Sequence, residues 1–148
     1  MKSQSLKFLL ALTFLFLFSG FSVVFGGDLK DGVVAYEGKD YEAAIKLLMP
    51  LAKHGDPQAQ LKVGKMFQNG QGVLRDHKEA AKWYFLSAEQ GHLSSNIIST
   101  AIAQYRLGIA YLEGQGVPQD HKEAIKWLLI SAELKNLKAL RLIRANIH

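Results

Sequence analysis

Two segments of this chain repeat one another, and an internal repeat constrains the fold of a chain more than any other feature of its sequence. Residues 59–91 read AQLKVGKMFQNGQGVLRDHKEAAKWYFLSAEQG, and residues 103–135 read AQYRLGIAYLEGQGVPQDHKEAIKWLLISAELK. Aligned at an offset of 44, the two segments are identical at 17 of 33 positions. A weaker copy precedes them, in which Asp40 lies 36 residues before Asp76. We therefore expect an array of similar units.

The two strong copies are further apart than the underlying period of 36 residues. The eight extra residues are most simply explained by an insertion, SNIISTAI, at residues 95–102. This segment lies at a junction between units, where it either lengthens the start of the next helix or forms a bulging loop. The sequence leaves both outcomes open.

Each unit has the pattern of two helices joined by a glycine-rich turn. In the third unit, Ala103, Leu107 and Ala110 recur at helical spacing and form an apolar stripe. After the glycines, Asp120 is placed as the N-cap of a second helix, with Glu123 three residues on. The predicted apolar face of this second helix consists of Ile125, Leu128, Leu129 and Ala132. The same reasoning predicts three helix pairs: Asp28 to Gly38 with Tyr41 to Lys53, Pro57 to Asn69 with His77 to Gln90, and Ala103 to Glu113 with His121 to Lys135.

A helix pair of this size cannot bury its apolar face alone, so neighbouring pairs must stack. We therefore expect an all-α fold, a right-handed α/α solenoid of about three helical hairpins plus a C-terminal capping helix. A last helix is predicted from Leu137 to Ile147, and Arg144 replaces the glycine of the repeat there, which favours a polar cap. The expected units are approximately residues 28–55, 57–91 and 93–135, followed by the cap at 137–148.

Residues 1–26 have the pattern of a secretory signal peptide. Lys2 and Lys7 precede an uncharged apolar run that ends in small residues, and cleavage after Gly26 leaves a repeat domain of residues 27–148. The alternative is an uncleaved membrane anchor, because about 18 apolar residues can span a bilayer. Both interpretations place the domain outside the cytoplasm, so we expect a secreted or periplasmic protein.

The composition excludes several classes of site. The chain contains no cysteine, so no disulfide, thiolate metal site or cysteine nucleophile can form. Without Lys2 and Lys7, 16 basic residues stand against 13 acidic ones, a net charge too small to indicate nucleic-acid binding. We therefore expect no nucleic-acid partner, no metal and no cofactor, and packing must stabilise the fold.

The repeats resemble the Sel1-like repeat family, a branch of the tetratricopeptide-like solenoids. The pattern A-Q-x-x-x-G-x-x-[FY]-x-x-G-x-G-V-x-x-D-x-x-x-A-x-x-W occurs twice, from Ala59 to Trp83 and from Ala103 to Trp127. The opening pattern G-x-x-A-Y-x-x-x-D-Y-x-x-A, at residues 32–44, resembles the family's first hairpin. The chain departs from the family at the insertion, and at Leu134 and Lys135, where the usual glutamine and glycine are missing.

The resemblance implies a scaffold or adaptor that binds a protein partner through its repeat surface, and not an enzyme. A cysteine-rich exported subgroup of the family is associated with β-lactamase activity or penicillin binding, but this chain lacks cysteine. Two alternatives stay open at this point. One is an enzyme or binder that acts on peptidoglycan or β-lactams, and the other is a structural subunit of an envelope assembly.

Residues that could carry chemistry have structural explanations at their positions. The glycine-rich turns lack the lysine and hydroxyl residue of a nucleotide-binding loop. His77 and His121 occupy equivalent positions without further metal ligands at suitable spacing. Asp76 and Glu79 stand where a helix needs its cap, and the two tryptophans should fill the space between stacked hairpins.

The candidate partner-binding site lies on the first helix of the third unit. In arrays of this kind the first helices line the concave surface, where partners bind. Placing residues at 100° steps puts three apolar residues opposite the core stripe, and we predict that they form a binding patch: Tyr105, Ile109 and Leu112. The predicted polar rim consists of Lys62, Lys65 and Arg106. The alternative is that the insertion or the last helix covers these residues.

Overall fold

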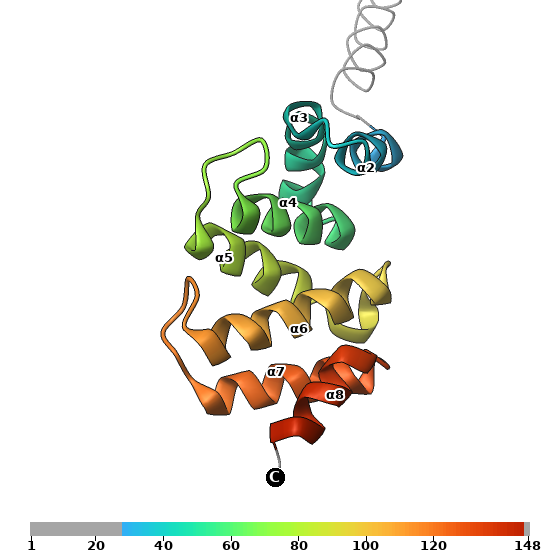
Figure 1. Ribbon diagram of the computed structural model, residues 1–148. Coiled ribbons are helices and arrows are strands. Elements are labelled where there is room, and N and C mark those ends of the chain that lie inside the picture. The colour runs from blue at the N-terminus through green and yellow to red at the C-terminus, as the bar shows by residue number, and fades with distance from the viewer. Residues whose placement is uncertain (1–27, 147–148) are drawn as a thin grey trace, which may run out of the picture.

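The computed structural model describes residues 28–146, and within this range every regular element is helical (Figure 1). The predicted signal peptide lies outside the described residues. No helix between residues 28 and 146 has both the length and the apolar character needed to cross a membrane. The elements in chain order are α2 (Leu29–Glu37), α3 (Tyr41–Lys53), α4 (Pro57–Asn69), α5 (His77–Ala88), the 3-10 helix η1 (Gly91–Leu93), α6 (Ile97–Glu113), α7 (His121–Glu133) and α8 (Leu137–Asn146).

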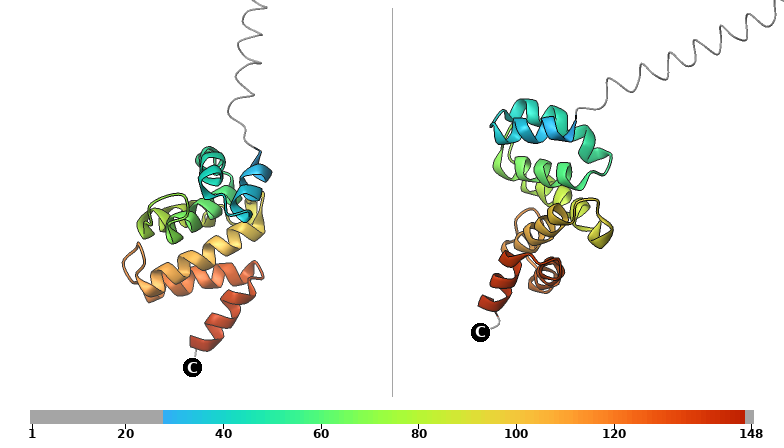
Figure 2. Two further views of the ribbon diagram at one scale, coloured as in Figure 1. Left: turned by 45° about the horizontal axis from the view of Figure 1, so that its top comes forward. Right: turned by 90° about the vertical axis from the view of Figure 1, so that its right-hand side faces the viewer.

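The helices stack as three hairpins followed by a single helix. Each helix packs against its neighbours in the sequence, and α4 also contacts α6 directly. The first helices therefore form the inner face of the array, and the second helices α3, α5 and α7 form its outer face (Figures 1 and 2). This arrangement confirms the predicted α/α solenoid with a last helix packed on α7.

The predicted N-caps are present in the structure. Asp120 Oδ1 accepts hydrogen bonds from the backbone N–H groups of Lys122 and Glu123 at 2.9 and 3.0 Å. Glu123 does not complete a reciprocal capping box, because the backbone N–H of Asp120 already donates to the carbonyl of Tyr111 at 2.9 Å. The Glu123 carboxylate pairs instead with Lys126 at 3.1 Å. The aspartate therefore caps the second helix and, through its backbone, ties it to the end of the first.

The second glycine of each turn is required by contact between hairpins. Gly116 has φ +77°, and a Cβ added there would overlap the backbone carbonyl of His77 at the start of α5. Gly72 occupies the equivalent position, with φ +68° and the same conflict with the carbonyl of Tyr41 at the start of α3. The turn of each unit therefore lies directly on the outer helix of the preceding unit, which only a residue without a side chain permits.

Both tryptophans are buried, as predicted. Trp83 packs with residues of α3 and α4, and Trp127 packs with residues of α4, α5 and α6. The Trp127 ring contacts Phe85 edge to face, with ring centroids 6.0 Å apart. The tryptophan of each second helix thus fills the space between its own hairpin and the preceding one.

One part of the predicted apolar face of α7 is exposed. Ile125 and Leu129 retain 54% and 48% of their accessible surface, whereas the neighbouring Leu128 is buried. The prediction that Ile125 and Leu129 face the core was wrong. The physical reason is that Leu129 is equivalent to Phe85, whose ring contacts Trp127 of the following second helix, and the described residues contain no second helix after α8.

The insertion lengthens the helix that follows it. Helix α6 has 17 residues where α4 has 13, and the segment before it forms the short helix η1. Asn96 caps α6 by accepting from the Ser99 N–H at 3.0 Å, and its amide also donates to Gln58 on α4 at 2.9 Å. The longer helix is therefore anchored at its start to the preceding hairpin.

The departures from the repeat at Leu134 and Lys135 have visible consequences. In the second unit, Gln90 donates to Gln60 Oε1 at 2.9 Å. Leu134 replaces that glutamine in the third unit, and the equivalent Oε1 atom of Gln104 is buried without a hydrogen-bond partner. Lys135 keeps the left-handed backbone of the glycine it replaces, with φ +61°. Helices α5 and α7 end at Ala88 and Glu133, two residues before the predicted ends, because these residues form the turn that follows.

Candidate functional site

A groove of about 420 Å³ lies on the inner face, between α6, the start of α8 and the turn that joins α7 to α8. Tyr105 lies in this groove, and so do two of the three predicted rim residues, Lys65 and Arg106. Four large aliphatic residues contribute to its walls, together with two further lysines: Ile98, Ile102, Leu134, Leu137, Lys135 and Lys138. The groove therefore combines apolar and cationic side chains from α4, α6 and α8.

Lys65 is half-buried among other cations. Burial lowers the pKa of Lys65 below its ordinary value, and the positive charges of Arg106, Lys62 and Lys138 lower it further. Arg106 is also half-buried, and its Nε atom has no hydrogen-bond partner in the described structure. The inner face therefore holds positive charge that the described part of the chain does not neutralise.

Lys62 marks the edge of this face toward the N-terminus. Its Nζ lies 4.4 Å from the centroid of the Tyr36 ring and 3.4 Å from Glu37 Oε1. Burial raises the pKa of Tyr36, and its hydroxyl lies 3.4 Å from Gln71 Oε1. Lys62 is therefore held in place by α2, through a cation–π contact and an exposed ion pair.

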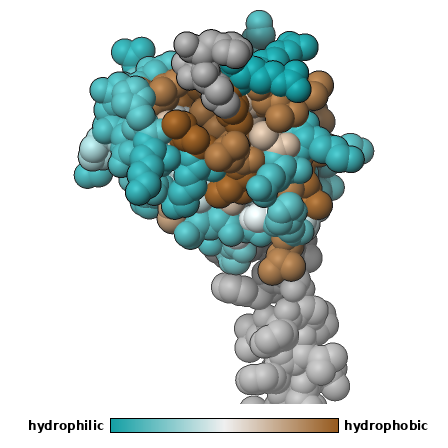
Figure 3. Space-filling view, turned by 90° about the horizontal axis from the view of Figure 1, so that it is seen from below, coloured by the Kyte–Doolittle hydropathy of each residue, from teal (hydrophilic) through white to brown (hydrophobic). Residues whose placement is uncertain are grey.

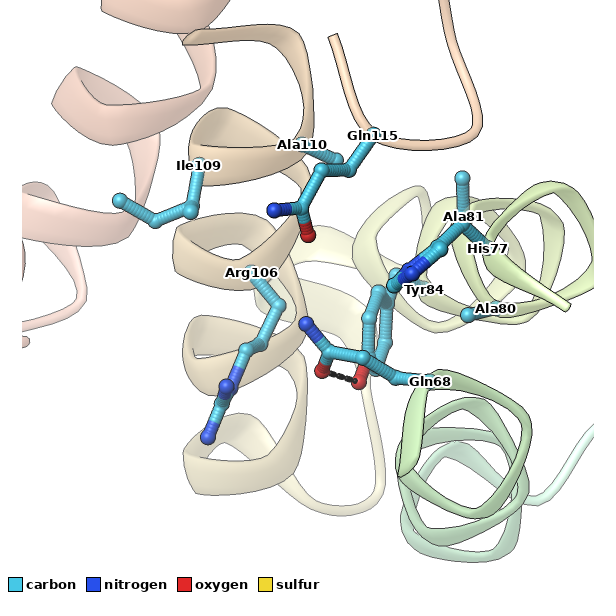
Figure 4. Close-up of a pocket in the computed structure, with 9 residues that line it drawn as sticks. All are labelled: Gln68, His77, Ala80, Ala81, Tyr84, Arg106, Ile109, Ala110 and Gln115. Atoms are coloured by element: carbon cyan, nitrogen blue, oxygen red, sulfur yellow. Dashed lines mark hydrogen bonds between the residues drawn. The ribbon is translucent and has the colours of Figure 1, made fainter. Parts of the chain in front are cut away.

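A small pocket of about 10 Å³ lies between α4, α5 and α6 and has room for about one water molecule (Figure 4). The Tyr84 hydroxyl donates to Gln68 Oε1 at 2.6 Å, and burial raises the pKa of this phenol above its ordinary value. Arg106 and Ile109 line the same pocket from α6, although the Ile109 side chain points to the side of α6 opposite Tyr84 (Figure 4). Arg106 thus lies between this pocket and the larger groove.

A second groove, of about 330 Å³, lies between α7 and α8 at the C-terminal end of the array. Leu112, the third residue of the predicted patch, lines this groove together with Ile125 and Leu129. Viewed from below, this end of the molecule has a central apolar area bordered by hydrophilic side chains (Figure 3). Leu112 therefore faces a different surface from Tyr105.

The structure divides the predicted patch among three places. Tyr105, Ile109 and Leu112 lie on one helix and all are half-buried, but they line the inner groove, the small pocket and the C-terminal groove respectively. Only Tyr105 lies with the predicted rim residues Lys65 and Arg106. The role of all six residues in partner binding stays a prediction.

Sequence reasoning missed most of the residues that line the inner groove, among them Ile98, Leu137 and Lys138. Ile98 belongs to the insertion, and Leu137 and Lys138 begin the last helix. Their sequence signal is weak, because none of them belongs to the repeat pattern and each comes from a segment outside the two strong copies. Ile98 and Leu137 are 74% and 65% exposed, and both lie in the same groove.

The buried serines have structural partners. Ser87 Oγ donates to the carbonyl of Pro57 at 2.9 Å, and Ser131 Oγ donates to the carbonyl of Ala101 at 2.6 Å. Each hydroxyl thus joins a second helix to the first helix of its own hairpin, at the first residue of α4 and at the fifth residue of α6. Between residues 28 and 146, no three side chains of the His, Cys, Asp or Glu type are grouped as metal ligands.

Comparison with known proteins identifies the repeats. Residues 57–92 and 101–136 each match the family model of the Sel1 repeat. The chain is similar to a solved Sel1 repeat protein from Oxalobacter formigenes, with 34% identity and a TM-score of 0.67 over 76% of this chain and 43% of that chain. It is also similar to c5321, a protective antigen of uropathogenic Escherichia coli strains with an SLR fold, at 34% identity and a TM-score of 0.65.

The second match covers 73% of this chain and 22% of the antigen, so the chain spans less than half the length of both structures. Cysteine rich protein B of Helicobacter pylori shares the fold, with 17% identity and a TM-score of 0.59 over 79% of this chain and 98% of that one. No curated protein matches the chain in sequence. Two matched repeats, stacked as in the solved Sel1 repeat structures, establish that the chain belongs to the Sel1 repeat family.

Proposed function

We propose that this protein is an interaction scaffold that holds a protein partner on the inner face of its repeat array. Sel1 repeat proteins act in general as protein-interaction scaffolds. The observation that carries the proposal here is the inner groove, where Tyr105 and the exposed Ile98 and Leu137 adjoin several cations. Exposed apolar side chains beside polar ones are typical of a surface that a partner covers.

A scaffold role is supported over an enzyme that acts on peptidoglycan or β-lactams. The buried serines donate to backbone carbonyls, and the aspartates at the starts of α5 and α7 accept from backbone N–H groups. A nucleophile needs a general base within hydrogen-bond reach, and these groups are engaged in holding the helices. Incubation of the purified protein with a chromogenic cephalosporin is expected to give no turnover, and saturable hydrolysis would favour the enzyme.

We also propose that the protein acts outside the cytoplasm. The support is the sequence of residues 1–26, with two lysines before a long uncharged apolar run. The test is mass spectrometry of the protein recovered from the periplasm of a Gram-negative host. A mass that lacks residues 1–26 is the expected result, and a full-length chain found only in the cytoplasm would contradict export.

Site-specific photocrosslinking tests whether the inner face binds the partner. A photoreactive phenylalanine analogue is placed at Tyr105 or Ile98 in the groove, and at Leu86, which is exposed on the outer helix α5. Cells that express each variant at the same level are irradiated, and the crosslinked proteins are identified by mass spectrometry. We expect one common partner from both groove positions and none of it from Leu86.

Equal crosslinking from both faces, or crosslinking from Leu86 alone, would contradict the proposal. A dimer of this protein crosslinked from the groove would instead favour a structural subunit of a self-associating assembly. Size-exclusion chromatography with light scattering checks that outcome independently.

A further inference from the structure

Positive charge is concentrated on three of the four first helices, α4, α6 and α8, whereas α2 contains one lysine and two acidic residues. Helices α4, α6 and α8 together contain six basic residues and a single acidic one, Glu113, at the C-terminal end of α6. The second helices α3, α5 and α7 contain six lysines and four glutamates. Net positive charge is therefore placed on the inner face more than on the outer one.

Three of the six lysines of the outer helices pair with a glutamate of their own helix. Lys46 pairs with Glu42 at 3.1 Å, and the equivalent lysines of α5 and α7 pair with glutamates of the first turn at 3.3 and 3.1 Å. These are exposed pairs between residues three or four positions apart, and each contributes about 0.3–0.5 kcal/mol to helix stability. Although these contributions are small, each of the three lysines has an opposite charge beside it.

The cations of the inner groove have no such partners. Within residues 28–146, no ion pair involves Lys65, Arg106 or Lys138, and Glu37 pairs with Lys62 at the exposed edge. The three side chains come from three different helices and meet in one groove. The lowered pKa of Lys65 reports their mutual repulsion as well as burial. Like charges held close together repel one another and destabilise the folded state, and a bound anion would replace this repulsion with attraction.

Arg106 adds a second, independent indication of a missing anion. Its Nε–H is buried and makes no hydrogen bond within the described structure, although a buried donor without a partner is destabilising. A carboxylate satisfies an arginine fork through two parallel hydrogen bonds, so it is the natural partner of this group. The groove walls beside the cations are apolar, and Ile98 and Leu137 are the most exposed apolar residues among them.

We propose that the inner groove selects an acidic peptide segment, with carboxylates bound by Lys65, Arg106 and Lys138 and an adjacent apolar side chain packed against Ile98 and Leu137. This inference rests on the proposed scaffold function and names the chemistry of the partner. A peptide fits better than an anionic membrane, because the cations lie on the inner face of the array, where a flat bilayer cannot follow. The apolar walls likewise distinguish the groove from a site for a bare phosphate.

The test is a selection of random twelve-residue peptides displayed on phage against the whole protein. The same library is selected against a variant that carries Lys65→Gln, Arg106→Gln and Lys138→Gln. A control variant removes the same amount of positive charge from the outer face through Lys46→Gln, Lys82→Gln and Lys126→Gln. Circular dichroism and thermal unfolding confirm that both variants are folded before the selection.

Peptides from the wild-type and control selections are expected to be enriched in Asp and Glu next to an apolar residue. Individual peptides should bind the inner-face variant at least about tenfold more weakly, since each charged hydrogen bond contributes strongly to affinity. Raising the salt concentration should weaken binding to the wild type and to the control alike. If the inner-face variant proves unfolded, the exposed single change Lys138→Gln is used with the same expectation of weaker binding.

Three outcomes would overturn the inference, and the first separates it from the scaffold proposal. If the selected peptides bind in the groove but lack acidic residues, the scaffold function stands and the anionic partner is refuted. If acidic peptides bind the inner-face variant as well as the wild type, the groove does not select them. If no peptide is enriched while vesicles of phosphatidylcholine and phosphatidylglycerol bind the wild type but not the inner-face variant, the cations serve a membrane and the peptide proposal fails.

Discussion

The contact between each turn and the preceding hairpin predicts a large effect for Gly116→Ala. An alanine at this position, with φ +77°, takes a left-handed backbone that is unfavourable for a side chain by about 1 kcal/mol. Its Cβ would also overlap the carbonyl of His77 and lie 2.7 Å from the backbone N of Lys78. Both are main-chain atoms of α5, so the overlap is relieved only by moving the turn away from the preceding hairpin. Overpacking of this kind destabilises the folded state by about 1–3 kcal/mol. Together with the backbone cost of about 1 kcal/mol, the expected loss in the free energy of unfolding is about 2–4 kcal/mol.

Gly114→Ala is the matched control, because it shares the backbone conformation without the contact between hairpins. Gly114 has φ +69°, and an added Cβ there meets Gln119 Cβ of its own turn at 3.3 Å. Replacing glycine by alanine lowers the conformational entropy of the unfolded chain by the same amount in both variants, so this effect on stability cancels when the two are compared. We expect a loss of about 1 kcal/mol for Gly114→Ala, and the difference between the two variants measures the contact between hairpins.

The assay is reversible thermal or urea unfolding of the repeat domain, followed by circular dichroism. For a domain of this size, about 1 kcal/mol corresponds to a shift in Tm of about 4 °C. Gly116→Ala should therefore lower the Tm by about 8–16 °C and Gly114→Ala by about 4 °C. Gly72→Ala, at the equivalent turn, should resemble Gly116→Ala. Equal losses for Gly116→Ala and Gly114→Ala would refute the argument that contact between hairpins, and not backbone conformation, requires the glycine.

Three further predictions concern buried polar groups. Leu134→Gln should give Gln104 Oε1 the hydrogen-bond donor that it lacks and so raise the free energy of unfolding by about 1 kcal/mol. The urea midpoint measures this gain, and an unchanged midpoint would contradict the prediction. Ser87→Ala should lower that free energy by about 1 kcal/mol, because it removes the hydroxyl that joins α5 to the start of α4, and a neutral result would show that the bond contributes nothing net. Burial keeps the pKa of Tyr84 above the ordinary 10.0 in the folded state, so the folded protein binds more protons than the unfolded chain and loses stability as the pH rises past about 10. Tyr84→Phe, which also loses the hydrogen bond to Gln68, should lose less free energy of unfolding between about pH 9 and about pH 11 than the wild type, and an identical pH dependence would contradict the assignment.

Much of the fold follows from short-range patterns. The starts of α3, α4, α5 and α7 agree with the predicted residues, because each start depends on an aspartate cap only one position away. The helix ends were less accurate, since α5 and α7 stop two residues earlier where the turn takes over. The sequence located the insertion but left its form open, and contacts of Asn96 with both Ser99 and Gln58 decided that it lengthens α6.

The candidate site was predictable only in part. The structure places Tyr105 in one groove with Lys65 and Arg106, and the role of these residues in partner binding stays a prediction. The helical wheel considers one helix at a time. It grouped Leu112 with Tyr105, but α8 lies between the surfaces that these two residues reach. The wheel cannot include a neighbouring helix whose position depends on packing, so Lys138 and Leu137 were missed.

By itself the sequence determined the repeat, the helix pairs, their caps and the turn glycines, since these depend on residues within about one turn or one period of each other. Only the tertiary structure decided that Lys65, Arg106 and Lys138 share one groove without a carboxylate partner. These residues are separated by 41 and 32 positions, and their meeting depends on the angle at which each hairpin stacks on the last. That angle is set by side-chain packing across the whole array, which no local pattern encodes.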